Sequence, residues 1–419
     1  MAVVEFNPNR VVIVGTDGRA NALTWRFQKD NPNLEVKTLP ADMDFNKIAQ
    51  EAADFGAGST IVSPEKPLVD GIVDTFNESG LPIVGPTKEA ARLEGDKVLA
   101  VRFMKNHNIP HPKSEVTTGK DAALDFVKNF YADPEKKFSP TGLVIKYPLL
   151  AAGKGVTLPE TLNEAVEEIE AIYGDGQKGK YGMVPGKMLF QERLMGKELS
   201  MMFLSDGRLV VPLLPARDYK KAYDGDLGPN TGGMGSYAPV EMQRYIFNQG
   251  MDIACKTVGG MAEEGHPFKG ILYAGLMLDR GKLSVLEYNV RFGDPEIQSL
   301  VVLIDNQLLD SLKATANGGL ASNKIIFSKG YGVTVVVAAE GYPQKSSKGA
   351  PITLPDLPEN VVIFPAGVQK TDGKLYTNGG RILAVNAKAD TLKDARELAT
   401  KVAGQVVFEG ARIRHDIAK

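Results

Sequence analysis

Short apolar runs alternate with amphipathic patterns through the first 95 residues of the chain. Runs rich in β-branched residues predict strands at 11–14, 34–39, 59–62 and 81–84. Apolar spacings of three and four predict helices at 44–55, 68–79 and 93–112, the last closed by Pro110 and Pro112. Because strands alternate with helices, we expect an α/β fold that begins with a parallel sheet covered by helices.

Beyond residue 112 the pattern indicates three further regions. The region 113–187 contains an acidic amphipathic pattern that predicts a helix at 162–173. The region 188–322 is dense in charged residues next to strand-like segments, and the remainder begins with the buried-strand pattern "YGVTVVVAAEGYP". A chain of 419 residues is too long for one core, so several domains are expected.

Composition narrows the class of protein. The chain is 43% hydrophobic and 24% charged, with a net charge of −2, which favours neither nucleic acid nor an anionic membrane as partner. Its one cysteine, Cys255, cannot form an internal disulfide. The start does not resemble a signal peptide, and no apolar run is long enough to span a membrane. We therefore expect a soluble, cytoplasmic protein.

The first glycine-punctuated turn lies in "VVIVGTDGRANAL", residues 11–23. A strand, a glycine turn at Gly15 and Gly18, and a helix start form an arrangement that seats phosphates in many folds. Asp17 opposes this interpretation, because its negative charge would repel a phosphate. It also stands where a dinucleotide fingerprint requires its second glycine, so we reject a nicotinamide-dependent dehydrogenase.

A lysine in a small-residue turn follows in "IKYPLLAAGKGV", residues 145–156. Small side chains let backbone N–H groups approach phosphate oxygens, and Lys154 adds a mobile cation. Lys146, on the preceding strand, would point a second cation at the same phosphates. The segment is not a Walker A loop, because Gly155 follows the lysine. A tight hairpin with a solvated lysine is the alternative.

The segment "VLEYNVRFGDPE", residues 285–296, carries the strongest chemical signal. Glu287 and Asn289 are two apart on an apparent strand, so their side chains leave the same face. Carboxylate and amide oxygens suit Mg²⁺, which takes one or two protein ligands and completes its shell with phosphates and water. Arg291 has the same parity and can hold a carboxylate with both amino groups. The alternative is the polar face of an edge strand.

Two loops complete the set of segments with candidate binding residues. "QERLMGKE", residues 191–198, can offer backbone groups to an adenine and a carboxylate to ribose hydroxyls. "ARDYKK", residues 216–221, leads into the glycine-rich "LGPNTGGMGSYAP", which either closes over a ligand or is floppy. The lysines, the candidate magnesium ligands and the candidate nucleotide-binding loop together indicate an enzyme of phosphoryl transfer. Such enzymes act mainly by positioning the reactants and neutralising charge.

These segments resemble the phosphoribosylamine–glycine ligase family, also called glycinamide ribonucleotide synthetase, of the ATP-grasp superfamily. The resemblance rests on "LAAGKGV", "GPNTGGMGSYAP", "RFGDPE", "TNGGR" and "FEG…R…DI", in that order from about residue 10 to 417. It implies a preATP-grasp domain at 1–95, a central ATP-grasp domain at 96–112 and 188–322, a lid at 113–187, and a small α+β C-terminal domain at 323–419. A biotin-dependent carboxylase shares the fold, but the motifs fit it less well.

The resemblance also implies ligands, substrates and their residues. ATP would contact Lys97, Lys146, Gly153, Lys154, Gly155, Gln191, Glu192 and Glu198. Magnesium, or manganese in its place, would bind Glu287 and Asn289. The carboxylate and amine substrates would contact Gly15, Asp17, Gly18, Arg19, Asn21, Asp218, Thr231, Gly232, Gly233, Arg291 and Asp294. Lys154, Asp218 and Arg291 are the expected catalytic residues, in a monomer or homodimer.

The chain departs from the family pattern mainly in its first loop. The family's usual G-x-G-G-R-E-H-A is here Gly15-Thr16-Asp17-Gly18-Arg19-Ala20-Asn21-Ala22, and no P-G-N-x-G loop follows it. We therefore expect an ATP-dependent carboxylate–amine ligase that activates glycine or a similar amino acid and has an altered amine site. A true phosphoribosylamine–glycine ligase of purine biosynthesis is the alternative. The second alternative is a regulatory homologue that binds nucleotide and is catalytically weak.

Overall fold

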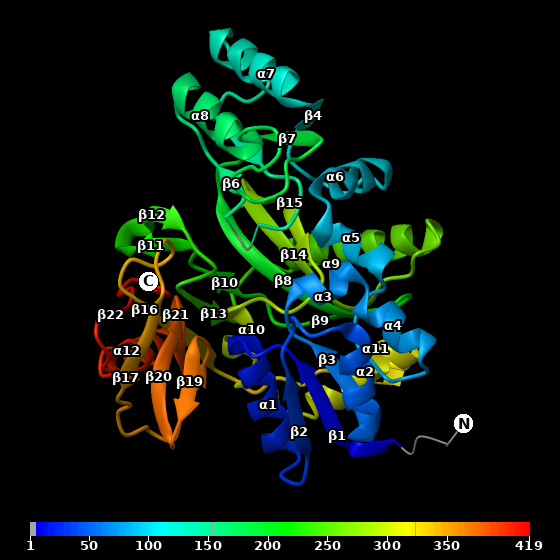
Figure 1. Cartoon of the computed structure of the whole chain (residues 1–419), viewed down its shortest axis with the longest axis vertical. Coiled ribbons are helices and arrows are strands. Elements are labelled where there is room, and N and C mark those ends of the chain that lie inside the picture. The colour runs from blue at the N-terminus through cyan, green and yellow to red at the C-terminus, as the bar shows by residue number, and fades with distance from the viewer. Residues whose placement is uncertain (1–5, 152–153, 323) are drawn as a thin grey trace.

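The structure, a computed structural model, describes residues 6–151, 154–322 and 324–419. Figure 1 shows a narrow upper part, a central sheet and two lower parts that lie side by side. Within the described ranges, no helix has the length and apolar content needed to cross a membrane.

The N-terminal part is a three-stranded parallel sheet in the order β2-β1-β3, with helices on both faces. Along β1, Val11 and Ile13 face α1, whereas Val12 and Val14 face α2 and α4. The elements are β1 (Asn7–Val14), α1 (Gly18–Asp30), β2 (Glu35–Leu39), α2 (Phe45–Asp54), β3 (Ala57–Val62), α3 (Glu65–Asp70), α4 (Ile72–Glu78), α5 (Lys88–Gly95) and α6 (Lys97–Asn106). The expected parallel sheet with covering helices is confirmed.

Three predicted elements differ from the structure. The helix expected at 68–79 is two helices, because Gly71 adopts a left-handed conformation (φ 103°) between α3 and α4. The helix expected at 93–112 breaks at Asp96, whose extended backbone ends α5 and whose carboxylate caps α6. The strand expected at 81–84 is reduced to one bridge between Val84 and Ile61, since Pro82 has no N–H to donate.

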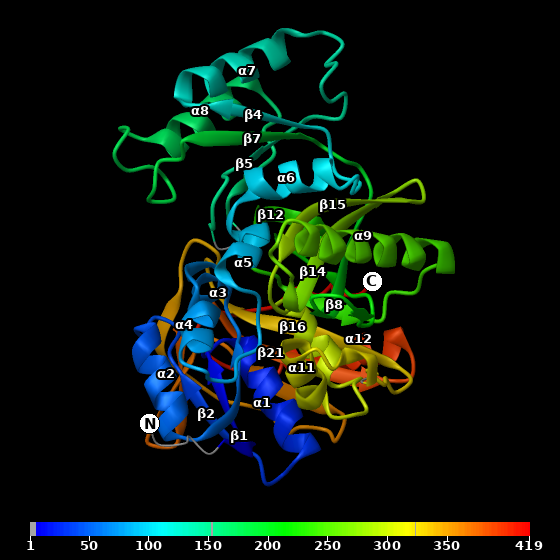
Figure 2. The same ribbon diagram turned by 90° about the vertical axis from the view of Figure 1, so that its right-hand side faces the viewer.

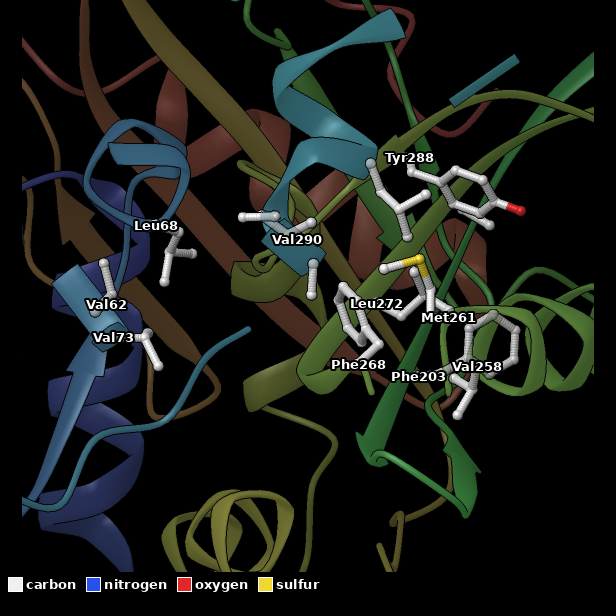
Figure 3. Close-up of a cluster of buried hydrophobic side chains, with 14 of the residues drawn as sticks. Val62, Leu68, Val73, Phe203, Val258, Met261, Phe268, Leu272, Tyr288 and Val290 are labelled. Carbon is white, nitrogen blue, oxygen red and sulfur yellow. The ribbon is translucent and has the colours of Figure 1, made fainter. Parts of the chain in front are cut away.

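The central part is an antiparallel sheet in the order β15-β14-β8-β9, with α9 on one face and α11 on the other. Figure 3 shows that its core continues into the N-terminal part: Val62, Leu68 and Val73 belong to the same buried cluster as Phe203 and Leu272. The two parts are therefore one packed body. The elements are β8 (Lys197–Asp206), β9 (Val210–Pro212), α9 (Arg244–Glu263), β14 (Lys269–Asp279), β15 (Lys282–Asn289), α10 (Glu296–Val301), α11 (Leu308–Asn317) and the 3-10 turn η2 (Leu320–Ser322).

The part that projects at the top of Figures 1 and 2 is a four-stranded sheet in the order β4-β7-β5-β6, backed by α7 and α8. Its elements are β4 (Ser114–Thr118), α7 (Lys120–Ala132), β5 (Leu143–Lys146), β6 (Val156–Thr157), α8 (Leu162–Tyr173) and β7 (Lys187–Glu192). The helix predicted at 162–173 is confirmed.

The C-terminal sheet, ordered β10-β13-β16-β21-β18, takes its first two strands from the segment around the glycine-rich loop. The loop is therefore built into this sheet at both ends. The elements are β10 (Arg217–Asp218), β11 (Lys221–Tyr223), η1 (Asp224–Asp226), β12 (Leu227–Asn230), β13 (Gly235–Ala238), β16 (Tyr331–Ala339), β17 (Ser347–Ile352), β18 (Val361–Pro365), β19 (Val368–Thr371), β20 (Lys374–Gly379), β21 (Arg381–Ala389), α12 (Leu392–Ala403) and β22 (Ala411–Arg412).

Candidate active site

A cavity of about 590 Å³ lies between the projecting sheet, the central sheet and the loops of the other two parts. This volume is in the range of small-molecule sites, about 300–1,000 Å³. The expected site residues that line it are Arg19, Lys97, Lys146, Gly155, Gln191, Glu192, Glu198, Asp218, Thr231, Gly232, Glu287, Asn289, Arg291 and Asp294. These residues come from the first three regions of the sequence, and Arg381 adds the C-terminal region to the same cavity.

The inner face of the projecting sheet forms one wall. Val144 on β5 stands opposite Gln191 on β7, and Lys146 stands opposite Leu189; all four line the cavity. The alternate residues of these strands face α7 and α8 in a separate core. Gln191 is buried: its Nε2 donates to Ser114 Oγ (2.9 Å), while its Oε1 has no hydrogen bond within the described residues. The wall is thus apolar, with one lysine and one unpaired amide oxygen.

Two lysines stand on this side of the cavity: Lys146 is buried and Lys97 is half-buried. Lys146 Nζ donates to Leu286 O (2.8 Å), and Lys97 Nζ donates to Leu149 O (2.9 Å). Burial lowers the pKa of Lys146 to about 8, despite the opposing effect of Glu287. Burial likewise lowers the pKa of Lys97. Both ammonium groups lack a carboxylate at hydrogen-bond distance within the described residues, so a ligand with negative charge would stabilise their protonated forms.

Glu287 and Asn289 leave the same face of β15 into the cavity, as predicted. Burial opposes ionisation of Glu287, but Lys220, Lys146 and Lys97 outweigh it and lower its pKa. No hydrogen bond from the described residues reaches this carboxylate; the ammonium of Lys220 is 3.9 Å away. Its oxygens are therefore free to ligate. Asn289 Oδ1 accepts a hydrogen bond from Arg291 Nη2 (2.9 Å), which fixes the amide's orientation.

This donor set fits a magnesium ion. Carboxylate and amide oxygens are hard ligands, and Mg²⁺ takes its remaining ligands from phosphates and water. Among the residues described, no group of three or more His, Cys, Asp or Glu side chains forms a complete protein cage for a metal. An ion bound here would need a ligand's oxygens to complete its shell.

A third cluster surrounds Asp218 at the deep end of the cavity. Burial raises its pKa to about 7; Lys220, 4.0 Å away, opposes this, while Glu296 and Glu198 add to it. Glu296 is buried and accepts hydrogen bonds from Tyr273 Oη (2.7 Å) and Ser200 Oγ (3.1 Å). A cationic group placed here would be stabilised by two carboxylates.

Arg291 follows β15 and is held by two carboxylates from the N-terminal part. Its Nη2 donates to Glu94 Oε1 (3.0 Å), and its Nε donates to Glu65 Oε2 (3.2 Å). Burial raises the pKa of Glu94 to about 7, although Arg291 lowers it. Four further residues of the cavity were not expected from the sequence: Glu65, Glu94, Glu296 and Tyr273. Glu296 stands in the quoted "RFGDPE", but only the fold brings the other three to the cavity.

The opening loop is more self-contained than expected. Asp17 caps α1: its Oδ1 accepts from Ala20 N (3.0 Å) and from Ser63 Oγ (2.5 Å). Its Oδ2 accepts from Arg19 Nη2 (2.6 Å). Burial disfavours the charged form, but Arg19 and these hydrogen bonds lower the pKa of Asp17 to about 2. The negative charge is therefore compensated within the protein. Asn21 Nδ2 donates to Pro365 O (2.8 Å) and so ties α1 to the C-terminal part.

Some expected residues lie outside the cavity's lining, and one lies outside the described residues. Gly15, Asp17, Gly18, Asn21, Lys154 and Gly233 do not line the cavity, and Gly153 is not among the described residues. Lys154 is exposed, and its Nζ is 3.4 Å from Pro343 O in the C-terminal part. Its neighbour Gly155 does line the cavity, where a Cβ would come within 2.8 Å of Ala151 Cβ.

The C-terminal part adds Arg381, from the quoted "TNGGR", a residue that was not expected in the site from the sequence. Its Nη1 donates to Gly232 O (2.8 Å) and Asp294 O (2.7 Å), and its Nη2 donates to Asp294 Oδ2 (2.8 Å). Arg381 thus joins the glycine-rich loop to the segment after β15.

The fold and this cavity define an ATP-dependent ligase of the ATP-grasp class. Its fold is also found in the biotin carboxylase of Campylobacter jejuni, with a TM-score of 0.70 over 97% of this chain and 93% of that one, at 13% identity. Three parts of the sequence match phosphoribosylglycinamide synthetase: the N domain at 9–94, the ATP-grasp (A) domain at 95–297 and the C domain at 332–419. The chain belongs to this family.

Named relatives extend over the full length of the chain. The phosphoribosylamine–glycine ligase of Rhodopirellula baltica is 37% identical over 97% of each chain, and that of Pasteurella multocida is 36% identical over 97% of each. The crystal structure of the Thermotoga maritima phosphoribosylamine–glycine ligase has a TM-score of 0.84 at 36% identity, and covers 97% of this chain and 100% of that one.

Proposed function

We propose that this chain is a phosphoribosylamine–glycine ligase, which joins glycine to 5-phosphoribosylamine and cleaves ATP to ADP and phosphate. The observation that carries the proposal is that Glu287, Asn289, Lys97, Lys146, Asp218 and Arg291 all line one cavity. Full-length similarity to enzymes of this name supports it.

The nucleotide would lie against the projecting sheet. Val144 and Leu189 would offer an apolar surface to the adenine, beside the amide of Gln191. Glu192 and Glu198 would face the ribose hydroxyls. Lys97 and Lys146 would contact the phosphates, since both line the cavity and neither has a carboxylate at hydrogen-bond distance among the described residues.

A magnesium ion would be held by Glu287 and Asn289. When bound, it would neutralise phosphate charge. Lys97 and Lys146 would share this task, because cations in a partly buried site act through a low effective dielectric. Glycine would be oriented by Arg291 at its carboxylate and by Asp218 at its ammonium.

The reaction follows from this placement. A glycine carboxylate oxygen attacks the γ-phosphorus, the bond to ADP breaks, and the carboxyl carbon gains a phosphate leaving group. The amine nitrogen of phosphoribosylamine then attacks this carbon, the phosphate leaves and the nitrogen loses a proton. The protein's groups position the reactants and neutralise charge in both steps.

The altered amine site expected from the sequence is the weaker hypothesis. It rested on the changed residues of the first loop, the missing P-G-N-x-G loop and the negative charge of Asp17. Arg19 compensates that charge at 2.6 Å, and similarity to phosphoribosylamine–glycine ligases over 97% of the chain favours the unaltered reaction. Arg19 itself lines the cavity. A regulatory homologue is also disfavoured, because the lysines, Glu287, Asn289 and Asp218 are all in place.

The test is to incubate the protein with ATP, Mg²⁺, glycine and phosphoribosylamine and to measure glycinamide ribonucleotide and ADP. We expect equal amounts of both products and none without glycine. Lys146→Met and Glu287→Gln should each reduce kcat by about 100-fold or more, because each removes charge that stabilises phosphoryl transfer. Rapid turnover with another amine, but none with phosphoribosylamine, would show that the acceptor assignment is wrong.

A further inference from the structure

The end of the chain crosses a hairpin beside the cavity. We call residues 411–417 the C-terminal strap. The hairpin consists of β11 and β12, which pair antiparallel with Lys221 opposite Asn230. In Figure 1 the C-terminus lies beside the labels of these two strands. The proposed function leaves this strap, with its "R…DI" motif, without a role.

Arg414 is the centre of the strap and is fully buried (0% exposed). Its Nη1 donates to the backbone oxygen of Lys221 (2.9 Å), and its Nη2 donates to Asp226 Oδ1 (3.0 Å). Asp416 accepts from its Nε and Nη2, both at 2.7 Å. The guanidinium also lies 5.2 Å from the centre of the Tyr219 ring. Because a buried cation is costly without these partners, the hairpin and strap are held in one arrangement.

Backbone groups extend the attachment. His415 N donates to Asp224 Oδ1 (2.8 Å), and Gly225 N donates to Asp416 Oδ2 (2.8 Å). Arg412 Nη1 donates to Ala222 O. The strap therefore contacts the hairpin at its first strand and at its turn.

The base of the hairpin lies in the cavity. Lys220, Lys221 and Asn230 line it, and Lys220 O accepts from Thr231 N (2.7 Å) and Thr231 Oγ1 (2.8 Å). Lys220 Nζ is 3.0 Å from Glu198 Oε2, and close to Glu287 and Asp218. Arg414 binds the carbonyl of the next residue, so a shift of the strap would move this ammonium relative to three carboxylates.

We propose that Arg414 is a positioning residue of the ligase: by holding the Lys221 carbonyl and Asp226, it places the Lys220 ammonium among Glu198, Glu287 and Asp218. The inference rests on the proposed function for its kinetic consequence. Its structural consequence, the fixed hairpin, is independent of the reaction.

The kinetic test compares Arg414→Met with Arg208→Met, the same change at an exposed arginine in the turn between β8 and β9. A displacement of a charged group by about 1 Å can lower a rate by up to about 100-fold. We therefore expect Arg414→Met, which would shift the Lys220 ammonium, to lower kcat by about 10- to 100-fold. The control should retain its kcat. Lys220→Met tests whether Arg414 acts through Lys220. If it does, adding Arg414→Met to the Lys220→Met protein should lower kcat by less than about threefold.

The second test needs no activity. Trypsin cleaves after lysine, and the strap should protect the bond between Lys221 and Ala222 in the folded protein. We expect Arg414→Met to be cut there several times faster than wild type and Arg208→Met. If Arg414→Met does not fold, Asp226→Asn replaces it, because the Asp226 side chain is 70% exposed and its loss of charge weakens one contact only.

The outcomes separate the two proposals. Inactive wild-type protein with the expected cleavage pattern would contradict the proposed function but keep the fixed hairpin. The role of Arg414 would be overturned if Arg414→Met were cleaved no faster than wild type. It would also be overturned if Arg414→Met lowered kcat as much in the Lys220→Met protein as in the wild type.

Discussion

The interpretation of the Asp17 charge differs between the sequence and the structure, because the structure shows the contacts of this side chain. In the sequence it is a negative charge in a turn of the kind that seats phosphates. In the structure it caps α1 and pairs with Arg19, whose side chain is only 10% exposed. Its first task is therefore local: it satisfies a helix end and a buried cation.

This assignment predicts the stability of two variants. Asp17→Ala removes both the cap and the partner of Arg19, and should lower the free energy of unfolding by about 2–4 kcal/mol. Asp17→Asn keeps an acceptor for the cap and should cost about half as much. Because the pKa of Asp17 is lowered from 3.8 to about 2, its contribution is present above pH 3.8 and is lost as the pH falls towards 2. Denaturant unfolding at pH 7 and pH 3 measures both effects. Equal losses in the two variants would contradict the capping role.

Asp218 and Lys146 predict the pH dependence of the reaction. Asp218 has a pKa raised to about 7 by burial, and it must be ionised to hold the glycine ammonium. Lys146 has a pKa lowered to about 8 by burial, and it must be protonated to contact phosphate. The kcat/KM for glycine should rise as the pH passes 7, and the kcat/KM for ATP should fall as it passes 8. Asp218→Asn should flatten the acidic limb of the first profile. An unchanged limb in this variant would assign it to another group.

Among the secondary-structure elements, the break between α5 and α6 sets the position of the site residue Lys97. Asp96 Oδ1 accepts from Val98 N and Leu99 N, both at 3.0 Å, so α6 starts at Lys97. A continuous helix would direct Lys97 elsewhere, because each residue turns the direction of the side chain by about 100°. The cap therefore orients Lys97, which we propose contacts the phosphates.

Asp96→Ala should lower the free energy of unfolding by about 1 kcal/mol and raise the KM for ATP several-fold, because the first turn of α6 frays and Lys97 moves. Asp96→Asn is the matched control, since an asparagine also caps helices. Steady-state kinetics and denaturant unfolding provide the measurements. A KM for ATP that is the same in both variants would show that the cap does not aim Lys97.

At the scale of the whole molecule, the C-terminal part is attached through the site. Arg381 joins β21 to the glycine-rich loop and to Asp294, and Asn21 joins α1 to Pro365. The cavity is therefore complete only when this part is docked.

Arg381→Met should weaken this docking, because it removes the hydrogen bonds to Gly232 and Asp294 and leaves the largely buried carboxylate of Asp294 without its ion-pair partner. We expect calorimetry to show an early, separate transition for the C-terminal part. Arg396→Met, on the surface helix α12, is the matched control and should unfold as the wild type does. A single unshifted transition in Arg381→Met would contradict the coupling.

Local spacing in the sequence was enough to predict several of the elements and the residues whose chemistry depends on that spacing. Alternation on one strand placed Glu287 and Asn289 on one face, and helical spacing located α8, because both patterns follow from backbone geometry. Only the tertiary structure decided the charge pairing. Glu65 and Glu94 reach Arg291 from more than 190 residues away along the chain, and Arg381 reaches Asp294 across 87. Such contacts depend on how whole parts of the chain pack against one another, so no local sequence pattern predicts them.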